Sequence, residues 1–214
     1  VVHDYGPAPL VAFFRHELDG RIGLERSFRI GEDYSLHLSA AVRGNLFFPD
    51  EDQRVRIDSV REATRALILQ QSAYLDLRDD PRNPHEGAFF AVDLQEGGFG
   101  GLSSWDYVRV TAEARGYISL PAGIVIAGRF GIGLMEVLGA YGLSADNIYQ
   151  LALLGPFSDQ LSGGGANSNR GFPAGYLGDV ELRTVDLRPL PDGSEGARPA
   201  VLVSGGIRRW ELTL

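Results

Sequence analysis

The 214-residue chain contains no cysteine and a single methionine. Without cysteine it can have no disulfide scaffold, no thiol nucleophile and no cysteine-based zinc site. Lysine and arginine number 20 against 28 aspartate and glutamate residues, which gives a net charge of −8. This excess of acid argues against nucleic acid as a partner, because phosphate neutralisation requires clustered cations.

Long apolar runs are also absent, and no stretch reaches the length of a transmembrane helix. A transmembrane β-strand needs only about ten residues with one apolar face, so strands that cross a membrane stay compatible with the sequence. No signal peptide opens the chain, which begins at Val1 and ends at Leu214 inside an alternating run. We therefore expect a segment of a longer protein.

The groupings that catalysis or cofactor binding requires are missing as well. The four histidines lack metal-ligand spacing. Gly163–Gly165 lacks the Lys-Ser/Thr ending of a phosphate-binding loop, and Gly97–Gly101 does not open a helix. We expect neither an enzyme nor a bound cofactor or metal.

What the sequence does contain is a two-residue alternation of apolar and polar side chains. It is cleanest after Trp105, where Val108 and Val110 oppose Arg109 and Thr111. This period is typical of strands that bury one face. The pattern predicts seven strands: Val11–Ile30, Tyr34–Phe47, Arg65–Arg78, Ala88–Glu96, Trp105–Leu120, Ile124–Leu134 and Val201–Leu214.

The connections between these strands are alternately short and long. The short ones are Gly31–Asp33, Asp79–Gly87 and Pro121–Gly123, and the long ones are Phe48–Thr64, Gly97–Ser104 and Met135–Ala200. Alternating short turns and long loops are typical of an outer-membrane β-barrel. The predicted fold class is therefore all-β, an antiparallel transmembrane barrel present in part, since single-chain bacterial barrels begin at eight strands. A soluble β-sheet, which also alternates, is the alternative.

Side chains on the predicted strands fit a barrel wall with a wet interior. The polar faces carry ionisable groups, and we expect a charged network in the lumen from Arg109, Glu113, Arg115 and Arg129. Aromatic side chains near strand ends are consistent with interfacial girdles. These aromatic residues are Tyr34, Trp105, Tyr107, Tyr117 and Trp210.

Two segments carry a more specific signal. Gly163–Asp179 reads GGGANSNRGFPAGYLGD, and its centre, Arg170-Gly171-Phe172, places a permanent cation in a backbone too rich in glycine for a helix. Residues 75–94 read LDLRDDPRNPHEGAFFAVDL, which is two strand-like stretches around a turn rich in aspartate and proline.

Both segments resemble the Omp85 superfamily, the outer-membrane protein insertases and translocators. The first resembles the family's sixth extracellular loop, which folds back into the barrel lumen, where acidic residues of later strands hold its arginine. The resemblance implies that Arg170 fixes the loop, Gly171 allows the close turn and Phe172 packs it. The implied loop latch motif is Gly164, Gly165, Ser168, Arg170, Gly171 and Phe172.

The second segment resembles the family's strand-turn-strand pattern. The residues that carry this resemblance are Asp76, Arg78, Asp79, Pro81, Pro84 and Gly87. The family barrel has sixteen strands, with the loop between the eleventh and the twelfth. Residues 1–214 would then cover about the sixth to the twelfth strand, with residues 135–200 as the long loop. The periplasmic POTRA domains and the last strands, with the acidic partners of Arg170, would lie outside the chain.

The resemblance further implies a location in the bacterial outer membrane and a function in assembling, inserting or translocating proteins. The implied partners are outer-membrane lipid, unfolded outer-membrane or secreted client proteins, and periplasmic chaperones or accessory proteins. The subtype stays open between a general insertase, a TamA-like factor, a two-partner secretion transporter and a barrel fused to a lipase domain. Two alternatives belong to other classes: an outer-membrane channel for small solutes with a plug loop, and a soluble β-sheet binding module.

Overall fold

The computed structural model describes residues 15–49, 55–56, 63–99, 101–141, 159, 161, 179–187, 197–204 and 207–214. Within these ranges no helix is long and apolar enough to cross a membrane. The one helical element described is the short turn η2, Pro121–Gly123. The strands are β1 Arg15–Ile30, β2 Tyr34–Pro49, β3 Val55–Arg56, β4 Thr64–Asp76, β5 Gly87–Gly97, β6 Trp105–Leu120, β7 Ile124–Ala140, β8 Asp179–Leu187, β9 Ala197–Ser204 and β10 Arg208–Thr213.

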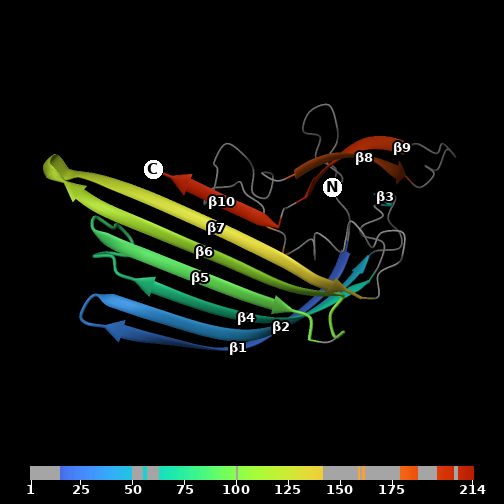
Figure 1. Cartoon of the computed structure of the whole chain (residues 1–214), viewed down its shortest axis with the longest axis horizontal. Coiled ribbons are helices and arrows are strands. Elements are labelled where there is room, and N and C mark those ends of the chain that lie inside the picture. The colour runs from blue at the N-terminus through green and yellow to red at the C-terminus, as the bar shows by residue number, and fades with distance from the viewer. Residues whose placement is uncertain are drawn as a thin grey trace.

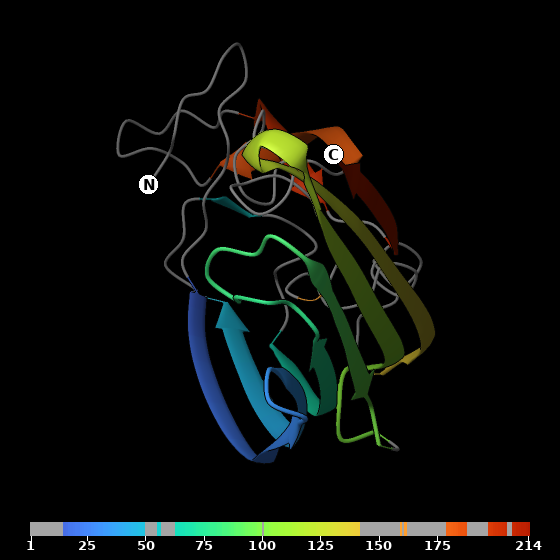
Figure 2. The same ribbon diagram turned by 90° about the vertical axis from the view of Figure 1, so that its left-hand side faces the viewer.

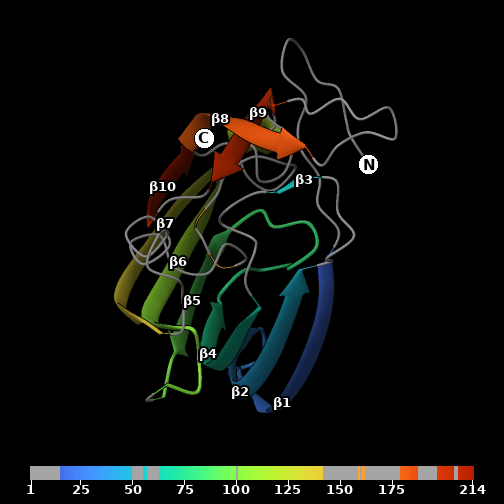
Figure 3. The same ribbon diagram turned by 90° about the vertical axis from the view of Figure 1, so that its right-hand side faces the viewer.

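Seven strands form one sheet in the order β1-β2-β4-β5-β6-β7-β10, and a second sheet has the order β3-β8-β9. Every neighbouring pair in the large sheet is antiparallel. Its short turns lie at one end, and its longer connections leave from the other end, near which β8 and β9 lie (Figure 1). The sheet curves from β1 to β10, as Figures 2 and 3 show, and these two strands are its edges. This confirms the predicted fold class, because the structure is an open, antiparallel part of a barrel wall.

The two faces of the large sheet differ in chemistry. Apolar side chains project from the outer face, where Ile22 and Leu24 are 79% and 83% exposed. Trp210 and Leu212 continue the same face on β10 at the other edge. So much exposed apolar surface suits contact with lipid. Charged and polar side chains alternate with them on the inner, concave face.

The strands that make up the wall begin close to the predicted residues, but two boundaries were wrong. β7 continues past Leu134 to Ala140, with a register shift opposite Asp106/Tyr107. Alternation fails there because the inner-facing Met135 is itself apolar and buried, and because the bulge inserts an extra residue.

The predicted last strand, Val201–Leu214, is divided between two sheets. β9 ends at Ser204 and pairs with β8, whereas β10 pairs with β7. Two glycines, at positions 205 and 206, separate the two strands in the sequence, where strand propensity is low. β8 itself lies inside the predicted long loop, where no strand was predicted. Its apolar residues change phase along the sequence, from Val180 and Leu182 to Val185 and Leu187, so it lacks a steady two-residue period.

The predicted aromatic girdle is wrong for part of its members. Trp105 and Tyr107 are only 6% and 1% exposed. Both occupy odd positions of β6, so they share the inner face with Arg109, Glu113 and Tyr117. Tyr34 and Trp210, at 44% and 76% exposed, do project outward.

Candidate functional site

The turn between β4 and β5 holds the first group of predicted site residues. Arg78 donates from Nε and Nη2 to the two carboxylate oxygens of Asp76, at 2.8 and 2.6 Å. Its Nη1 donates to the Pro81 carbonyl, and its guanidinium lies 5.0 Å from the centre of the Phe89 ring. A two-point bond between planar groups fixes orientation as well as distance. Arg78 therefore joins the end of β4, the turn and β5.

Asp79 organises the second half of this turn. Its Oδ1 accepts the backbone N–H groups of His85 at 3.0 Å and of Glu86 at 3.1 Å. These bonds favour the ionised carboxylate and hold the pKa of Asp79 below its ordinary value. Its own N–H donates to the Glu86 carbonyl.

Gly87 closes the turn with φ of +103°, a conformation that side chains rarely adopt. A Cβ atom there would collide with the Leu77 carbonyl oxygen and lie 2.9 Å from the Arg78 Cα. Pro84 is partly buried in the same turn. All six predicted strand-turn residues thus lie in this turn or at the strand ends that flank it.

A band of charge crosses the inner face of β6, β7 and β10. Glu113 accepts from Arg115 on its own strand and from Arg129 on β7. Arg129 Nη1 lies 3.8 Å from Glu211 on β10, which also accepts from Arg209 at 2.6 Å. We call this set the charge band: Arg115, Glu113, Arg129, Glu211 and Arg209.

Glycine opens space within the charge band. Gly131 is the register partner of both Glu113 and Glu211, so no side chain stands between the two carboxylates. The structure therefore brings together Glu113, Arg115 and Arg129 of the predicted lumen residues. Arg109 stands apart: its Nε is buried and has no hydrogen-bond partner among the described residues, as is also true of Oε1 of its cross-strand neighbour Gln95.

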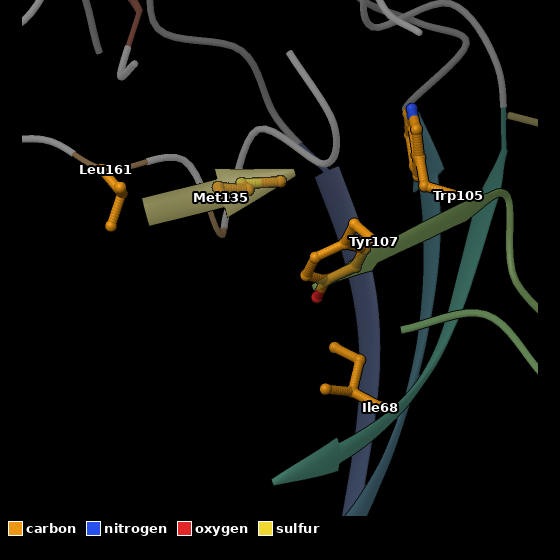
Figure 4. Packing of buried hydrophobic residues seen from close by; sticks show 5 residues of the cluster. All are labelled: Ile68, Trp105, Tyr107, Met135 and Leu161. Carbon is orange, nitrogen blue, oxygen red and sulfur yellow. The ribbon is translucent and has the colours of Figure 1, made fainter. Parts of the chain in front are cut away.

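A buried cluster covers the other end of the inner face, toward the long connections. Five residues form it: Ile68 of β4, Trp105 and Tyr107 of β6, Met135 of β7, and Leu161 (Figure 4). Tyr107 donates its hydroxyl to Asp159 Oδ2 at 2.8 Å, and both side chains are buried. Asp159 and Leu161 belong to the connection between β7 and β10, so this connection contacts the inner face of the wall.

The loop latch motif lies outside the described residues. Gly164, Gly165, Ser168, Arg170, Gly171 and Phe172 therefore keep the status of a sequence prediction. Among the residues that the structure does describe, no group of three or more His, Asp or Glu side chains is placed to hold a metal ion.

A comparison with protein-family models identifies the family of this chain. The model of the Omp85 superfamily domain matches residues 16–206, which is most of the chain. The chain belongs to the Omp85 superfamily. As an Omp85 chain it falls in a family of outer-membrane proteins that act in protein insertion or transport. A comparison with curated proteins found no match.

Sequence reasoning missed several residues of this Omp85 inner face. Tyr107 was assigned to a girdle, and Asp159, Leu161, Gly133 and Glu211 were not singled out. The parity of β6 could have placed Tyr107 inside, since it shares odd numbering with Arg109 and Glu113. Nothing local in the sequence indicates that Asp159 would meet Tyr107.

Proposed function

We propose that this chain supplies part of the wall and the inward loop of an Omp85-type barrel that inserts or translocates proteins at a bacterial outer membrane. The observation that carries the proposal is the contact of Asp159 and Leu161 with the inner face, since it brings the long connection into the concave side of the wall. Such a barrel works by binding and guiding polypeptide, and it is no enzyme.

The proposed partners follow from the two faces of the sheet. Many exposed apolar side chains on the outer face offer lipid a contact surface. Unfolded outer-membrane or secreted proteins would be the clients, delivered by periplasmic chaperones or accessory proteins. Within the family, this function covers general insertases, TamA-like factors, two-partner secretion transporters and barrels fused to a lipase domain.

In this proposal Arg170 is the cation that latches the loop in the lumen. The family resemblance implies acidic partners beyond Leu214, but β10 follows the loop within this chain and carries Glu211 on its inner face. Glu211 already accepts from Arg209, and a carboxylate can accept several such bonds. We therefore propose Glu211 as one partner of Arg170.

The test uses Arg170→Ala, Arg170→Lys and Glu211→Gln in the complete protein. We expect each to lower the amount of folded client protein in the outer membrane and the temperature at which the barrel loses its compact gel mobility. Lysine should not rescue, because it replaces a planar fork by a point charge. If the two residues interact, the double variant should be less impaired than the sum of the singles.

Arg82→Ala serves as the control, because Arg82 is exposed in the β4–β5 turn and its one described bond comes from its backbone N–H. Unchanged client assembly together with unchanged heat resistance in Arg170→Ala would contradict the proposal. Solute-selective conductance without any effect on other membrane proteins would instead support a small-solute channel.

A further inference from the structure

The buried cluster on the inner face contains two wall residues whose geometry suits them to hold a segment of chain. Tyr107 is 1% exposed and lies against Gly97 of β5, its register partner. A Cβ atom at Gly97 would lie 2.7 Å from Cδ1 of the Tyr107 ring, so only glycine leaves room for the ring there. The neighbouring strand thus fixes the ring and aims its hydroxyl.

The hydroxyl of Tyr107 has a buried acidic partner. Asp159 is 7% exposed and accepts from Tyr107 at 2.8 Å across 52 residues of sequence. A buried carboxylate that loses its donor carries a large desolvation cost, so this bond favours the seated position of residue 159. The bond holds the Asp159 carboxylate beside the Tyr107 hydroxyl on the inner face of the wall.

The second contact is a notch in β7. A Cβ atom on Gly133 would lie 2.8 Å from Cδ2 and 3.0 Å from Cδ1 of Leu161, so the leucine side chain fills the place where a side chain would stand. Leu161 belongs to the same buried cluster as Met135 and Ile68 (Figure 4). Gly131, two residues away on the same face, has nothing within 4 Å of a Cβ atom. The close approach is therefore specific to Gly133.

We propose that Tyr107 and Gly133 are positioning residues that anchor the long connection at Asp159 and Leu161, at a point separate from Arg170. The Tyr107–Asp159 bond fixes the distance of residue 159 from the sheet. The contact of Leu161 with Gly133 fixes the position of residue 161 along β7. The segment that carries the latch motif then starts from a fixed point on the inner face. The role of this anchor rests on the proposed function, but its existence is tested without reference to protein assembly.

The experiment measures whether the anchored segment shields position 135 of β7 from a labelling reagent. Residues 1–214 contain no cysteine. Met135→Cys, in the complete protein with any other cysteine replaced by serine, therefore places a single thiol in the buried cluster that contains Leu161, where Met135 is 3% exposed. Its labelling by a small membrane-impermeant maleimide is followed in outer membranes, and retained heat-resistant gel mobility shows that each variant is folded.

We expect Gly133→Val and Tyr107→Phe each to raise the labelling rate of this thiol by about tenfold, since each removes one principal contact of the anchor. Gly131→Val is the matched control, with the same substitution on the same strand and face, and should leave labelling unchanged. Asp159→Asn should also retain protection, because the amide oxygen still accepts from Tyr107.

Two outcomes would overturn the proposal. Equal labelling in Gly133→Val and Gly131→Val would show that the notch holds nothing. A rise in Arg170→Ala as large as in Gly133→Val would show a single shared attachment instead of two. Normal client assembly in Arg170→Ala, by contrast, would contradict the proposed function alone. The labelling rates would still decide whether the anchor exists.

Discussion

The β4–β5 turn and the buried cluster lie toward opposite ends of the same wall and are held in opposite ways. In the turn, Arg78 and Asp79 bond partners two to seven residues away. In the cluster, Tyr107 and Asp159 are 52 residues apart. The turn is polar and largely exposed, whereas the cluster is mostly apolar and buried.

This difference separates what a short peptide can specify from what only the assembled sheet can specify. The turn needs only its own sequence, since its donors, acceptors and the left-handed Gly87 are neighbours in the chain. The cluster exists only after β4, β6 and β7 are in register, because it takes one or two side chains from each. Substitutions at the two places should therefore have separable effects.

The largest expected effect comes from Gly87→Ala, which breaks the turn. The added Cβ would meet the Leu77 carbonyl in a left-handed conformation, and we expect a loss of about 1–3 kcal/mol or more. Heat-induced loss of compact gel mobility measures it. Gly116→Ala is the control, because a Cβ at Gly116 meets nothing within 4 Å. An equal fall in this temperature for Gly87→Ala and Gly116→Ala would mean that the left-handed conformation of Gly87 does not stabilise the turn.

A smaller effect is expected from Glu113→Gln, in the charge band between the two regions. Arg115 and Arg129 would lose their shared carboxylate, at a cost of about 1–2 kcal/mol once the exposure of Arg115 is considered. Thermal unfolding at low and high salt measures the loss, which should shrink as salt rises. Labelling of Met135→Cys should not change, because the cluster does not depend on this pair.

The control for the charge band is Glu25→Gln on β1. The Glu25 side chain is 77% exposed and lies 3.9 Å from His37, and a pair so exposed contributes little. If the Glu25 and Glu113 variants lose equal stability, the charge band contributes no more to the stability of the sheet than an exposed ion pair does.

The smallest effect is expected from acid acting on Asp79. Its folded pKa lies below the ordinary value of 3.8 because backbone N–H groups bond the ionised form. Its contribution to stability is therefore complete above about pH 4 and is lost as pH falls through the folded pKa. Heat resistance measured from pH 6 to pH 3 should decline more in the native protein than in Asp79→Asn. Parallel curves for the two would contradict this assignment.

Much of the wall could be predicted from sequence, because lipid on one face and water on the other enforce a strict alternation. Tyr34, Trp105 and Ile124 begin strands at the predicted residues. Prediction failed where the inner face stops being polar. Met135 and Tyr107 face the buried cluster, so the alternation ended early on β7 and an inner aromatic residue was assigned to the girdle.

The turn residues could be grouped from the sequence because their contacts are local. The cluster was missed because burial of Asp159 and Leu161 depends on a glycine notch in a strand far away in the sequence. The role of Arg170 remains a prediction, since its segment lies outside the described residues.

The pairing of β7 with β10 has a consequence for how the wall assembles. β1 and β2 are joined across residues 31–33, and β6 and β7 across residues 121–123, but the chain between β7 and β10 runs from residue 141 to residue 207. The entropy lost on closing a loop grows with its length, and contacts distant in sequence form late. We expect the hairpins to zip first and this junction last. The hydrogen bond from the Met135 N–H to the Ile207 carbonyl would then be among the final contacts made.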